Sequence, residues 1–503
     1  MGVTLALTKR KIWRAFIAWV TVWILIFGYG VKTYALSVED ERKLGEKFMS
    51  LIKKEMEFIE DPQITSYVSK IGERIVSQTG HQPFECKFYV INSSELNAFA
   101  APAGQVFINS GLIAILDKEG ELASIISHEM GHVTARHIAK RIEKSKVLSW
   151  ITLAGALAGM LLGKGSDAGA ALATSSMAAG ASLTLKYTRD DEREADRLGL
   201  KFMIKAGYDG SDMIEAFKKL RKHGLVSSEI PPYLSTHPGL DERIIDLEQR
   251  MLFTPSKKAV NEVGVKDKAA GDGTLKPLSA NTSLTGFTLH SEKVAENNEF
   301  RRVKILLMAK YSDPQKTLSF LKSELKSNPQ DFFAHYGLGL TYKRIKRMDK
   351  ALKEFEIASS LKPNAAFILR ELGICYLYKG DFNLSIKSLR KATTIDPEDN
   401  DAYYYLARSY QESGNKDTSL KIYQYLKTKG FDSPDVYYNI GVIYGEKGLW
   451  GPAHYHLAVF FKKKGERDNA LYHFRQALNF YQGDSKKERE INQEIGEVSR
   501  NIP

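Results

Sequence analysis

The chain has 503 residues, more than one ordinary domain needs, so we expect two or three domains. Its residues are 43% hydrophobic and 26% charged, which excludes a wholly disordered chain and a multi-span membrane protein. With only two cysteines, Cys86 and Cys375, it is neither a disulfide scaffold nor a thiolate zinc cluster. The formal net charge of +12 raises the question of a nucleic-acid or acidic-membrane partner.

The distribution of charge along the chain answers part of that question. Residues 1–35 carry five basic groups and no acidic ones, residues 36–252 carry 27 basic and 30 acidic groups, and the rest carry 40 and 30. The middle segment contains the candidate catalytic residues and is slightly acidic. An enzyme that acts on nucleic acid usually has its excess of basic residues beside its catalytic residues. We therefore expect no nucleic-acid partner and interpret the basic C-terminal half as a solvated surface.

The N-terminus has the pattern of a targeting segment. Four basic residues precede an uncharged run of 17 residues, Ala15–Val31, which is short for a membrane span and suits the core of a signal peptide. Two small residues, Thr33 and Ala35, favour cleavage before Leu36, so we predict a bacterial secretory signal over residues 1–35. An uncleaved membrane anchor is the alternative. Both interpretations place the rest of the chain in the periplasm, in the second case attached to the membrane.

Helices dominate the segment that follows. In chain order, the expected elements are helices over residues 37–59 and from Pro62, strands over 84–92 and 106–109, a long helix over 119–146 and a helix over 188–207. Val147–Leu185 differs because it is nearly uncharged and rich in Gly, Ala, Ser and Leu. We interpret it as a lid or as an interfacial segment in contact with a membrane surface, with packed helices as the alternative. Its Lys164 lacks the spacing of a phosphate-binding loop, so we expect no ATP.

The C-terminal third repeats itself with a period of 34 residues. The first copy has small, aromatic and bulky side chains at Gly339, Tyr342, Ala351, Phe355, Ala358 and Pro363, and similar residues recur three more times. This pattern is typical of tetratricopeptide helix pairs, in which the small residues let two helices approach. We expect such an array to bind an extended or helical peptide in its concave face.

The candidate zinc-binding and catalytic motif is Ser127–His132. His128 and His132 are four residues apart on the expected long helix, so both imidazoles project from one face and can bind one zinc ion. Glu129 lies beside the open coordination position, where it can take a proton from water. A helix with two surface histidines is the alternative, so a third ligand is needed. A metzincin would have a histidine at position 138, and Ile138 excludes that class.

A second helix offers the third ligand. Glu192 and Asp196 share one of its faces, one turn apart. Glu192 can ligate zinc, and Asp196 can accept a hydrogen bond from a ligating histidine and so fix its tautomer. His137 is out of register with the zinc-binding face and Glu194 points elsewhere, so we interpret both as solvated. The two helices together predict a hydrolase with one zinc ion.

These motifs resemble the gluzincin family of zinc metallopeptidases that includes the HtpX, Oma and CAAX prenyl proteases. The resemblance is strongest to its periplasmic BepA-like branch, which carries tetratricopeptide repeats, and it covers about residues 36–480. It rests on Asn97–Ala100 with Gly104–Leu112, the His128–His132 run, Arg189–Asp196, and Thr236–Pro238 with Arg243. It implies that Glu192 is the third ligand and that His237 and Arg243 lie near the substrate carbonyl, where they would stabilise the oxyanion. Ala103 departs from the family's Pro-Gly-Gly turn.

One strand is a candidate for substrate binding. Val106, Phe107, Ile108 and Asn109 could form an edge strand that pairs with an extended substrate backbone. An ordinary core strand is the alternative. For His237, the alternative to a functional role is a structural histidine in a turn before Pro238.

The resemblance implies a periplasmic zinc endopeptidase that cleaves misfolded or stalled outer-membrane proteins. Its repeats would bind these unfolded substrates or the outer-membrane protein assembly machinery. Two alternatives stay open. One is a chaperone-like binding module whose peptidase is normally shut, with His237 in the open zinc position. The other is a membrane-anchored protease.

We therefore predict a mostly α (α+β) chain: a helical zincin-type peptidase domain with a small β-sheet, followed by a tetratricopeptide α-solenoid. The expected parts are a signal peptide (1–35), a zinc metallopeptidase domain (36–252), a linker (253–297), a tetratricopeptide domain (298–480) and a C-terminal tail (481–503).

Overall fold

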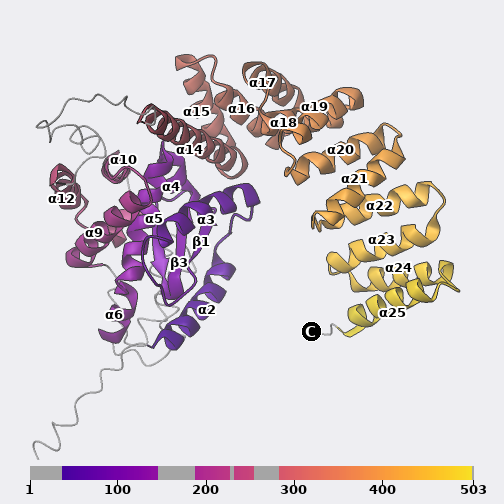
Figure 1. The fold of residues 1–503 in the computed structure, drawn as a ribbon, viewed down its shortest axis with the longest axis horizontal. Helices are drawn as coiled ribbons and strands as arrows, with labels where there is room; N and C mark the ends of the chain where they lie inside the picture. The colour runs from indigo at the N-terminus through magenta and orange to yellow at the C-terminus, as the bar shows by residue number, and fades with distance from the viewer. Residues whose placement is uncertain (1–36, 145–186, 227–230, 254–281, 501–503) are drawn as a thin grey trace, which may run out of the picture. The chain divides into compact units, whose positions relative to one another are not determined.

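The computed structural model describes residues 37–144, 187–226, 231–253 and 282–500 (Figure 1). They form two compact units, which are divided in the sequence between Lys304 and Ile305. The predicted signal peptide, the Val147–Leu185 insertion and most of the predicted linker lie outside the described residues. Within the described ranges, every helix is too short or too polar to cross a membrane.

The N-terminal unit is mostly helical and contains a small sheet, as the sequence predicts. Its elements are α2 (Val38–Glu55), α3 (Pro62–Val76), β1 (Lys87–Ile91), β2 (Ala98–Ala101), the 3₁₀ turn η1 (Pro102–Gly104), β3 (Gln105–Asn109), α4 (Ser110–Ile115), α5 (Glu119–Thr134), α6 (His137–Lys144), α9 (Arg189–Lys205), α10 (Ser211–Val226), α11 (Pro232–Thr236), α12 (Leu240–Phe253) and the first part of α14 (Thr282–Tyr311). The helix starts follow local chemistry. The side chain of Ser37 caps α2, and Thr188 forms a capping box with Asp191 at the start of α9.

The sheet has three strands in the order β1-β3-β2. β3 pairs in parallel with β1 and antiparallel with β2, and all five of its residues are buried. The prediction that Val106–Asn109 is an edge strand is therefore wrong. Both backbone edges of β3 are already paired, so this strand has no free hydrogen-bonding edge for a substrate. It is the core strand that the alternative interpretation described.

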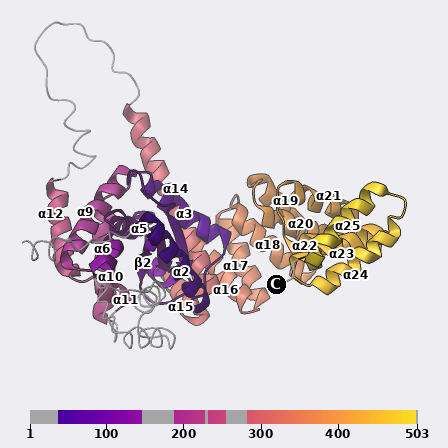
Figure 2. The same ribbon diagram turned by 90° about the horizontal axis from the view of Figure 1, so that it is seen from below.

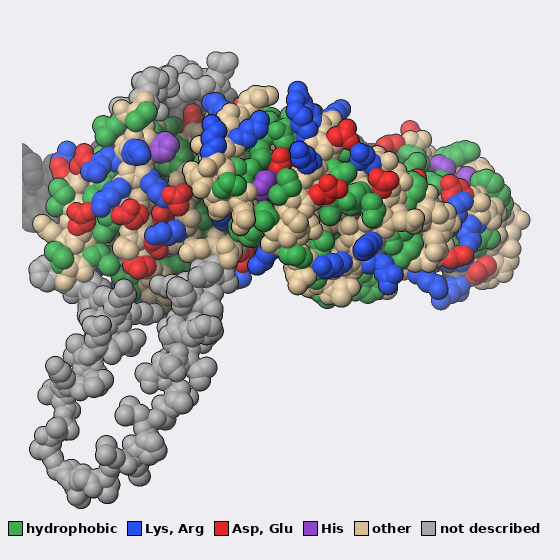
Figure 3. Space-filling model, turned by 90° about the horizontal axis from the view of Figure 1, so that it is seen from above, with side chains coloured by type: hydrophobic (Ala, Val, Ile, Leu, Met, Phe, Trp, Pro, Cys, Tyr) green, Lys and Arg blue, Asp and Glu red, His purple; other side chains and the backbone are tan. Residues whose placement is uncertain are grey.

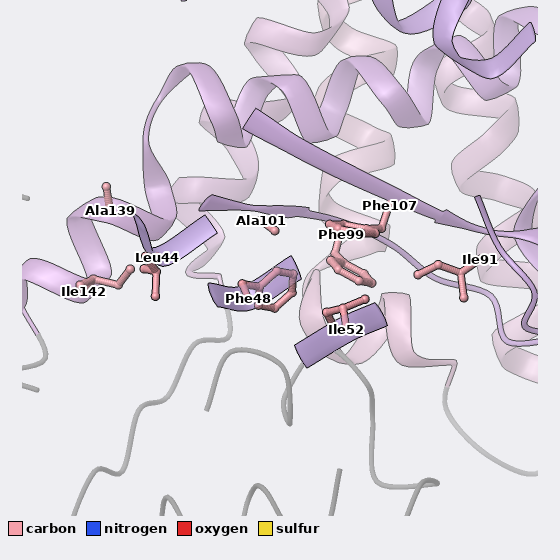
Figure 4. Close-up of a cluster of buried hydrophobic side chains, with 9 residues drawn as sticks. All are labelled: Leu44, Phe48, Ile52, Ile91, Phe99, Ala101, Phe107, Ala139 and Ile142. Carbon is pink, nitrogen blue, oxygen red and sulfur yellow. The ribbon is translucent and has the colours of Figure 1, made fainter. Parts of the chain in front are cut away.

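A hydrophobic cluster joins the sheet to the first helix. Leu44, Phe48 and Ile52 recur every four residues along α2 and form its fully buried face. They pack in one cluster with Phe99 and Phe107 of the sheet, whose rings stack with centroids 5.0 Å apart (Figure 4). α5 in turn contacts β2 and β3, so the sheet supports the helix that carries the histidine pair.

The helix predicted over residues 119–146 is in fact two helices. α5 ends at Thr134, and α6 begins at His137 after a turn. In that turn Arg136 has a left-handed backbone with φ 52°, which interrupts the helix. Its guanidinium binds the buried carboxylate of Glu41 at 2.7 Å. Because neither glycine nor proline marks this break, hydrophobic periodicity alone predicts one continuous helix.

The C-terminal unit is a stack of helix pairs, as the 34-residue period predicts (Figure 2). After α14 it contains α15 (Pro314–Ser327), α16 (Phe332–Arg344), α17 (Met348–Leu361), α18 (Ala366–Lys379), α19 (Phe382–Ile395), α20 (Asn400–Glu412), α21 (Lys416–Thr428), α22 (Pro434–Glu446), α23 (Trp450–Lys463), α24 (Arg467–Phe480) and α25 (Ser485–Arg500). Small residues do allow close approach within a pair. A Cβ atom on Gly339 would lie 2.6 Å from the ring of Phe355, and one on Gly373 would lie 2.6 Å from Leu389.

The ends of this unit differ from the sequence expectation. Helix α14 begins at Thr282, inside the predicted linker. The predicted tail contains helix α25, whose Ile491 and Val498 are buried against α24. On the face shown in Figure 3, basic side chains are interspersed with acidic ones on the repeat helices, as expected for a solvated surface.

Candidate metal centre and active site

Four buried side chains from three parts of the chain converge on one point. His128 and His132 come from α5, Glu192 comes from α9, and His237 follows α11. One ligand atom from each lies within 4.8 Å of the others, and each of the four side chains is fully buried or nearly so. Within the described ranges, no other set of at least three histidine, cysteine or carboxylate side chains meets this criterion.

Glycine makes this convergence sterically feasible. A Cβ atom on Gly131 would lie 2.5 Å from the carbonyl oxygen of Ala195, and one on Gly199 would lie 2.9 Å from that of Ser127. α5 and α9 therefore touch backbone to backbone, with a glycine from each helix at the contact. This close packing brings Glu192 within 3.5 Å of the Nε2 atoms of both His128 and His132.

Asp196 lies beside His128, the ligand it was predicted to orient. Its Oδ1 lies 2.8 Å from Nδ1 of His128, which leaves Nε2 of that ring facing the cluster. A carboxylate at Nδ1 fixes the tautomer in which Nε2 carries the free lone pair. Burial favours the protonated carboxyl, but Arg243 outweighs it and lowers the pKa of Asp196 to about 2. Asp196 is thus an anion across the physiological pH range.

Arg243 is bound to the carboxylates behind the cluster. Its Nε and Nη2 each donate to Asp196 at 2.7 Å, and its Nη1 lies 2.6 Å from Glu192. The guanidinium also lies over the ring of Phe217, 4.5 Å from its centroid. The structure therefore brings Arg243 to the predicted site, where it holds two carboxylates in position.

Glu129 is placed differently from the other acidic groups. Its side chain is fully buried, yet neither carboxylate oxygen has a hydrogen-bond partner among the described residues. His237 lies close by, with its Nε2 3.7 Å from Oε1 of Glu129. A buried carboxylate without partners is costly, so its place beside the cluster indicates a group that water or substrate completes.

His237 takes part in the cluster itself. Its Nδ1 lies 3.1 Å from Oε1 of Glu192 and 3.3 Å from Nε2 of His128. Tyr233 stacks on its ring at 4.4 Å, and the ring of Tyr187 is 5.1 Å away. The two tyrosines were not singled out from the sequence, because nothing in their local pattern points to the cluster.

His137 was wrongly interpreted as a solvated residue, whereas Glu194 does keep a partly exposed side chain. His137 is only 1% exposed, and its Nδ1 lies 2.8 Å from Nδ1 of His132. On its other side, Nε2 of His137 lies 3.2 Å from Oε2 of Glu194, a side chain that is 42% exposed. Burial lowers the pKa of His137, although Glu194 acts in the opposite direction. The turn at Arg136, which the sequence does not reveal, brings His137 to this position.

The donor set fits a zinc ion. Two histidines and a glutamate converge within bonding reach of one point, and the unsatisfied carboxylate of Glu129 lies beside them. Val106, Phe107, Ile108 and Asn109 lie in the buried central strand β3. Fold and site together define a zinc metallopeptidase unit followed by a helical repeat unit.

Comparison with known proteins agrees with this class. Residues 62–251 match Peptidase family M48, and residues 334–365, 371–399 and 401–429 match tetratricopeptide repeats. The chain is thus an M48 zinc metallopeptidase with tetratricopeptide repeats.

Named relatives support this family membership. The "Beta-barrel assembly-enhancing protease" of Escherichia coli (strain K12) is 28% identical over 397 residues, which cover 76% of this chain and 80% of that protein. A "Putative beta-barrel assembly-enhancing protease" of Vibrio cholerae is 35% identical over 44% of this chain and 46% of that protein. The "Mitochondrial metalloendopeptidase OMA1" of Schizosaccharomyces pombe is 29% identical over 37% of this chain and 52% of that protein.

Proposed function

We propose that this chain is a periplasmic zinc endopeptidase that cleaves misfolded or stalled outer-membrane proteins. The Escherichia coli relative, which this chain matches over 80% of that protein's length, is called a beta-barrel assembly-enhancing protease, and that name supports the substrate class. The predicted secretory signal supports the compartment. The repeats would bind unfolded substrates or the outer-membrane assembly machinery, since stacked helix pairs offer an extended peptide-binding surface. We expect neither nucleic acid nor ATP to take part.

His128, His132 and Glu192 would hold one zinc ion per chain, since these are the three M48-type ligands that converge. A zinc ion bound there supplies Lewis-acid polarisation of the peptide carbonyl. Glu129 takes the proton of the attacking water and passes it to the leaving amine, because its carboxylate is buried, unpaired and adjacent. His237 stabilises the oxyanion, while Arg243 and Asp196 keep the ligands in position.

The unsatisfied carboxylate of Glu129 carries this proposal, and a single substitution tests it. We expect the full-length Glu129→Gln variant to bind zinc like the unchanged protein and to digest casein at least a hundredfold more slowly. Glu85→Gln is a matched control, since Glu85 is 82% exposed and should not affect either property. Full activity of the Glu129 variant, or an unchanged chain that binds no zinc, would contradict the proposal.

His237 favours a second candidate, a binding module whose peptidase is normally shut. Its Nδ1 lies among the ligand atoms, so the ring could complete a closed set of four donors. His237→Ala separates the two roles. Casein digestion falls if His237 stabilises the oxyanion, and it rises if His237 blocks the open position.

The compartment is tested at the N-terminus of the mature protein. A start at Leu36 supports a cleaved secretory signal and release into the periplasm. An intact N-terminus in the membrane fraction supports the membrane-anchored alternative instead.

A further inference from the structure

One histidine in the peptidase unit has no role in the family motif or in the proposed reaction. His137 is buried, and its Nδ1 faces the metal-centre residue His132 while its Nε2 faces Glu194. On a continuous helix, residues five positions apart would point about 140° away from each other. The end of α5 at Thr134 and the left-handed Arg136 instead fold His137 back beside His132.

The hydrogen-bond directions along this contact are fixed by His132. Its Nε2 faces the cluster, 3.1 Å from Nε2 of His128 and 3.5 Å from Oε1 of Glu192. A nitrogen that binds a metal must offer a lone pair, so the ring proton of His132 resides on Nδ1. That N–H can only donate to an acceptor, and the atom at 2.8 Å is Nδ1 of His137.

The same argument assigns the ring proton of His137. If its Nδ1 accepts, then its proton resides on Nε2 and must be donated in turn. Oε2 of Glu194 lies 3.2 Å from that nitrogen, and Oδ1 of Asp191 lies 3.7 Å away. Arg141, on the same helix as His137, binds Asp191 and so ties α6 to the start of α9.

We propose that His137 is a positioning residue for the metal ligand His132, which it links by hydrogen bonds to the carboxylate of Glu194. The two ligating histidines are then supported in two different ways. His128 donates directly to Asp196, whereas His132 reaches a carboxylate through an intervening imidazole. Outer partners of this kind orient the ligating ring and strengthen its metal affinity by about 10–100-fold.

A pair of variants of equal shape tests the hydrogen bond rather than the packing. Asparagine and leucine have nearly the same branched shape, but only asparagine has an acceptor atom where Nδ1 of His137 lies. We expect His137→Leu to weaken zinc binding by at least tenfold. His137→Asn should weaken it only severalfold, because asparagine keeps the acceptor for His132 and loses only the contact with Glu194. Zinc affinity is measured on the full chain by competition with a fluorescent chelator. The absorption spectrum of the cobalt-loaded protein should shift in His137→Leu and not in His137→Asn.

A second pair of variants tests the hydrogen bond between His137 and Glu194. Glu194→Ala should weaken zinc binding severalfold, whereas Asp190→Ala should not, because Asp190 is 87% exposed on the same helix and binds Arg193. Equal zinc affinity in the two His137 variants would overturn the role of His137. Equal affinity in the Glu194 and Asp190 variants would overturn that of Glu194.

This inference rests on the proposed zinc site, and the measurements separate the two. If the unchanged chain binds no zinc, the proposed function fails as well. If the unchanged chain binds zinc and digests casein while His137→Leu binds zinc equally well, only the role of His137 fails.

Discussion

Two residues of the peptidase unit adopt a backbone conformation that glycine normally takes. Ala103 and Arg136 both have a left-handed backbone without being glycine, with φ angles of 63° and 52°. Such a conformation costs an L-residue about 1–2 kcal/mol. Arg136 is compensated by its ion pair with the buried Glu41, and it delivers His137 to His132. Ala103 stands in the turn between β2 and β3.

We predict that Ala103→Gly stabilises the peptidase unit by about 0.5–1 kcal/mol. Glycine removes the strain of the left-handed backbone in the folded state. This gain exceeds the loss that comes from the higher conformational entropy of glycine in the unfolded chain. Hydrogen exchange of β2 and β3 amides measures the change. Ala100→Gly is the control: Ala100 lies in extended β2, so its replacement should destabilise the unit. A destabilised Ala103→Gly variant would contradict the argument.

At the scale of elements, the active site depends on how closely α5 and α9 approach. Their contact is made by backbone atoms at Gly131 and Gly199, and one side chain there would push the helices apart. Separation of the helices would move Glu192 away from His128 and His132, which lie on the partner helix. The two glycines therefore help to set the geometry of the ligands.

We expect Gly131→Ala to destabilise α5 and α9 by about 1–3 kcal/mol and to weaken zinc binding, because its Cβ would lie 2.5 Å from the Ala195 carbonyl oxygen. Hydrogen exchange of both helices and zinc competition measure the two effects. In Gly496→Ala, the added Cβ on α25 meets nothing within 4 Å. That control should gain stability from the higher helix propensity of alanine. Zinc binding at full strength in Gly131→Ala would contradict this account.

In the repeat unit, ion pairs link residues about one repeat apart. Lys379 binds Asp349 at 2.7 Å, and Lys447 binds Asp417 at 2.5 Å. The hydrogen bond from each lysine lowers the pKa of its aspartate below the ordinary 3.8. A carboxyl with a depressed pKa stabilises the fold above about pH 4, and this contribution is lost as the pH falls through the folded-state value.

We therefore predict that amide exchange in α17–α23 accelerates as the pH falls from about 5 to about 3, after correction for intrinsic exchange rates. The double variant Asp349→Asn, Asp417→Asn should show a weaker dependence over the same range. About 0.5 M salt should also reduce it, because both pairs are largely exposed. An equally strong dependence in the double variant would show that other groups are responsible.

At the scale of the whole molecule, we expect the two units to depend on metal to different degrees. The four metal-facing side chains all lie in the N-terminal unit, on α5, on α9 and after α11. A ligand that binds only the native state stabilises the part of the fold that holds it. The repeat helices are instead held by contacts between neighbours, such as Gly339 against Phe355.

Chelation of the metal should therefore destabilise the N-terminal unit only. We expect it to abolish casein digestion and to accelerate amide exchange in α5 and α9, while α16–α23 keep their protection. Hydrogen exchange with mass spectrometry on the full chain resolves the two units, and added zinc should restore both properties. Equal loss of protection in both units would contradict separate stabilisation.

Much of the fold and the metal ligands was predictable because local spacing encodes them. The four-residue interval of His128 and His132 fixes their common face on any α-helix. The 34-residue period likewise predicts the repeat helices. By contrast, the central position of β3 and the break after Thr134 were missed. The order of strands in a sheet leaves no local pattern in the sequence. Arginine does not favour a left-handed backbone, so the sequence gives no sign that Arg136 adopts one.

By itself, the sequence determined which side chains could bind zinc, that Glu129 stands beside them, and that helix pairs follow. These are properties of spacing along one helix or one period. Only the tertiary structure decided that His237 joins the cluster, that Arg243 holds Asp196 and Glu192, and that His137 supports His132. Each of these contacts joins residues whose proximity depends on a turn or on two helices touching at glycine, and such contacts follow from packing rather than from periodicity.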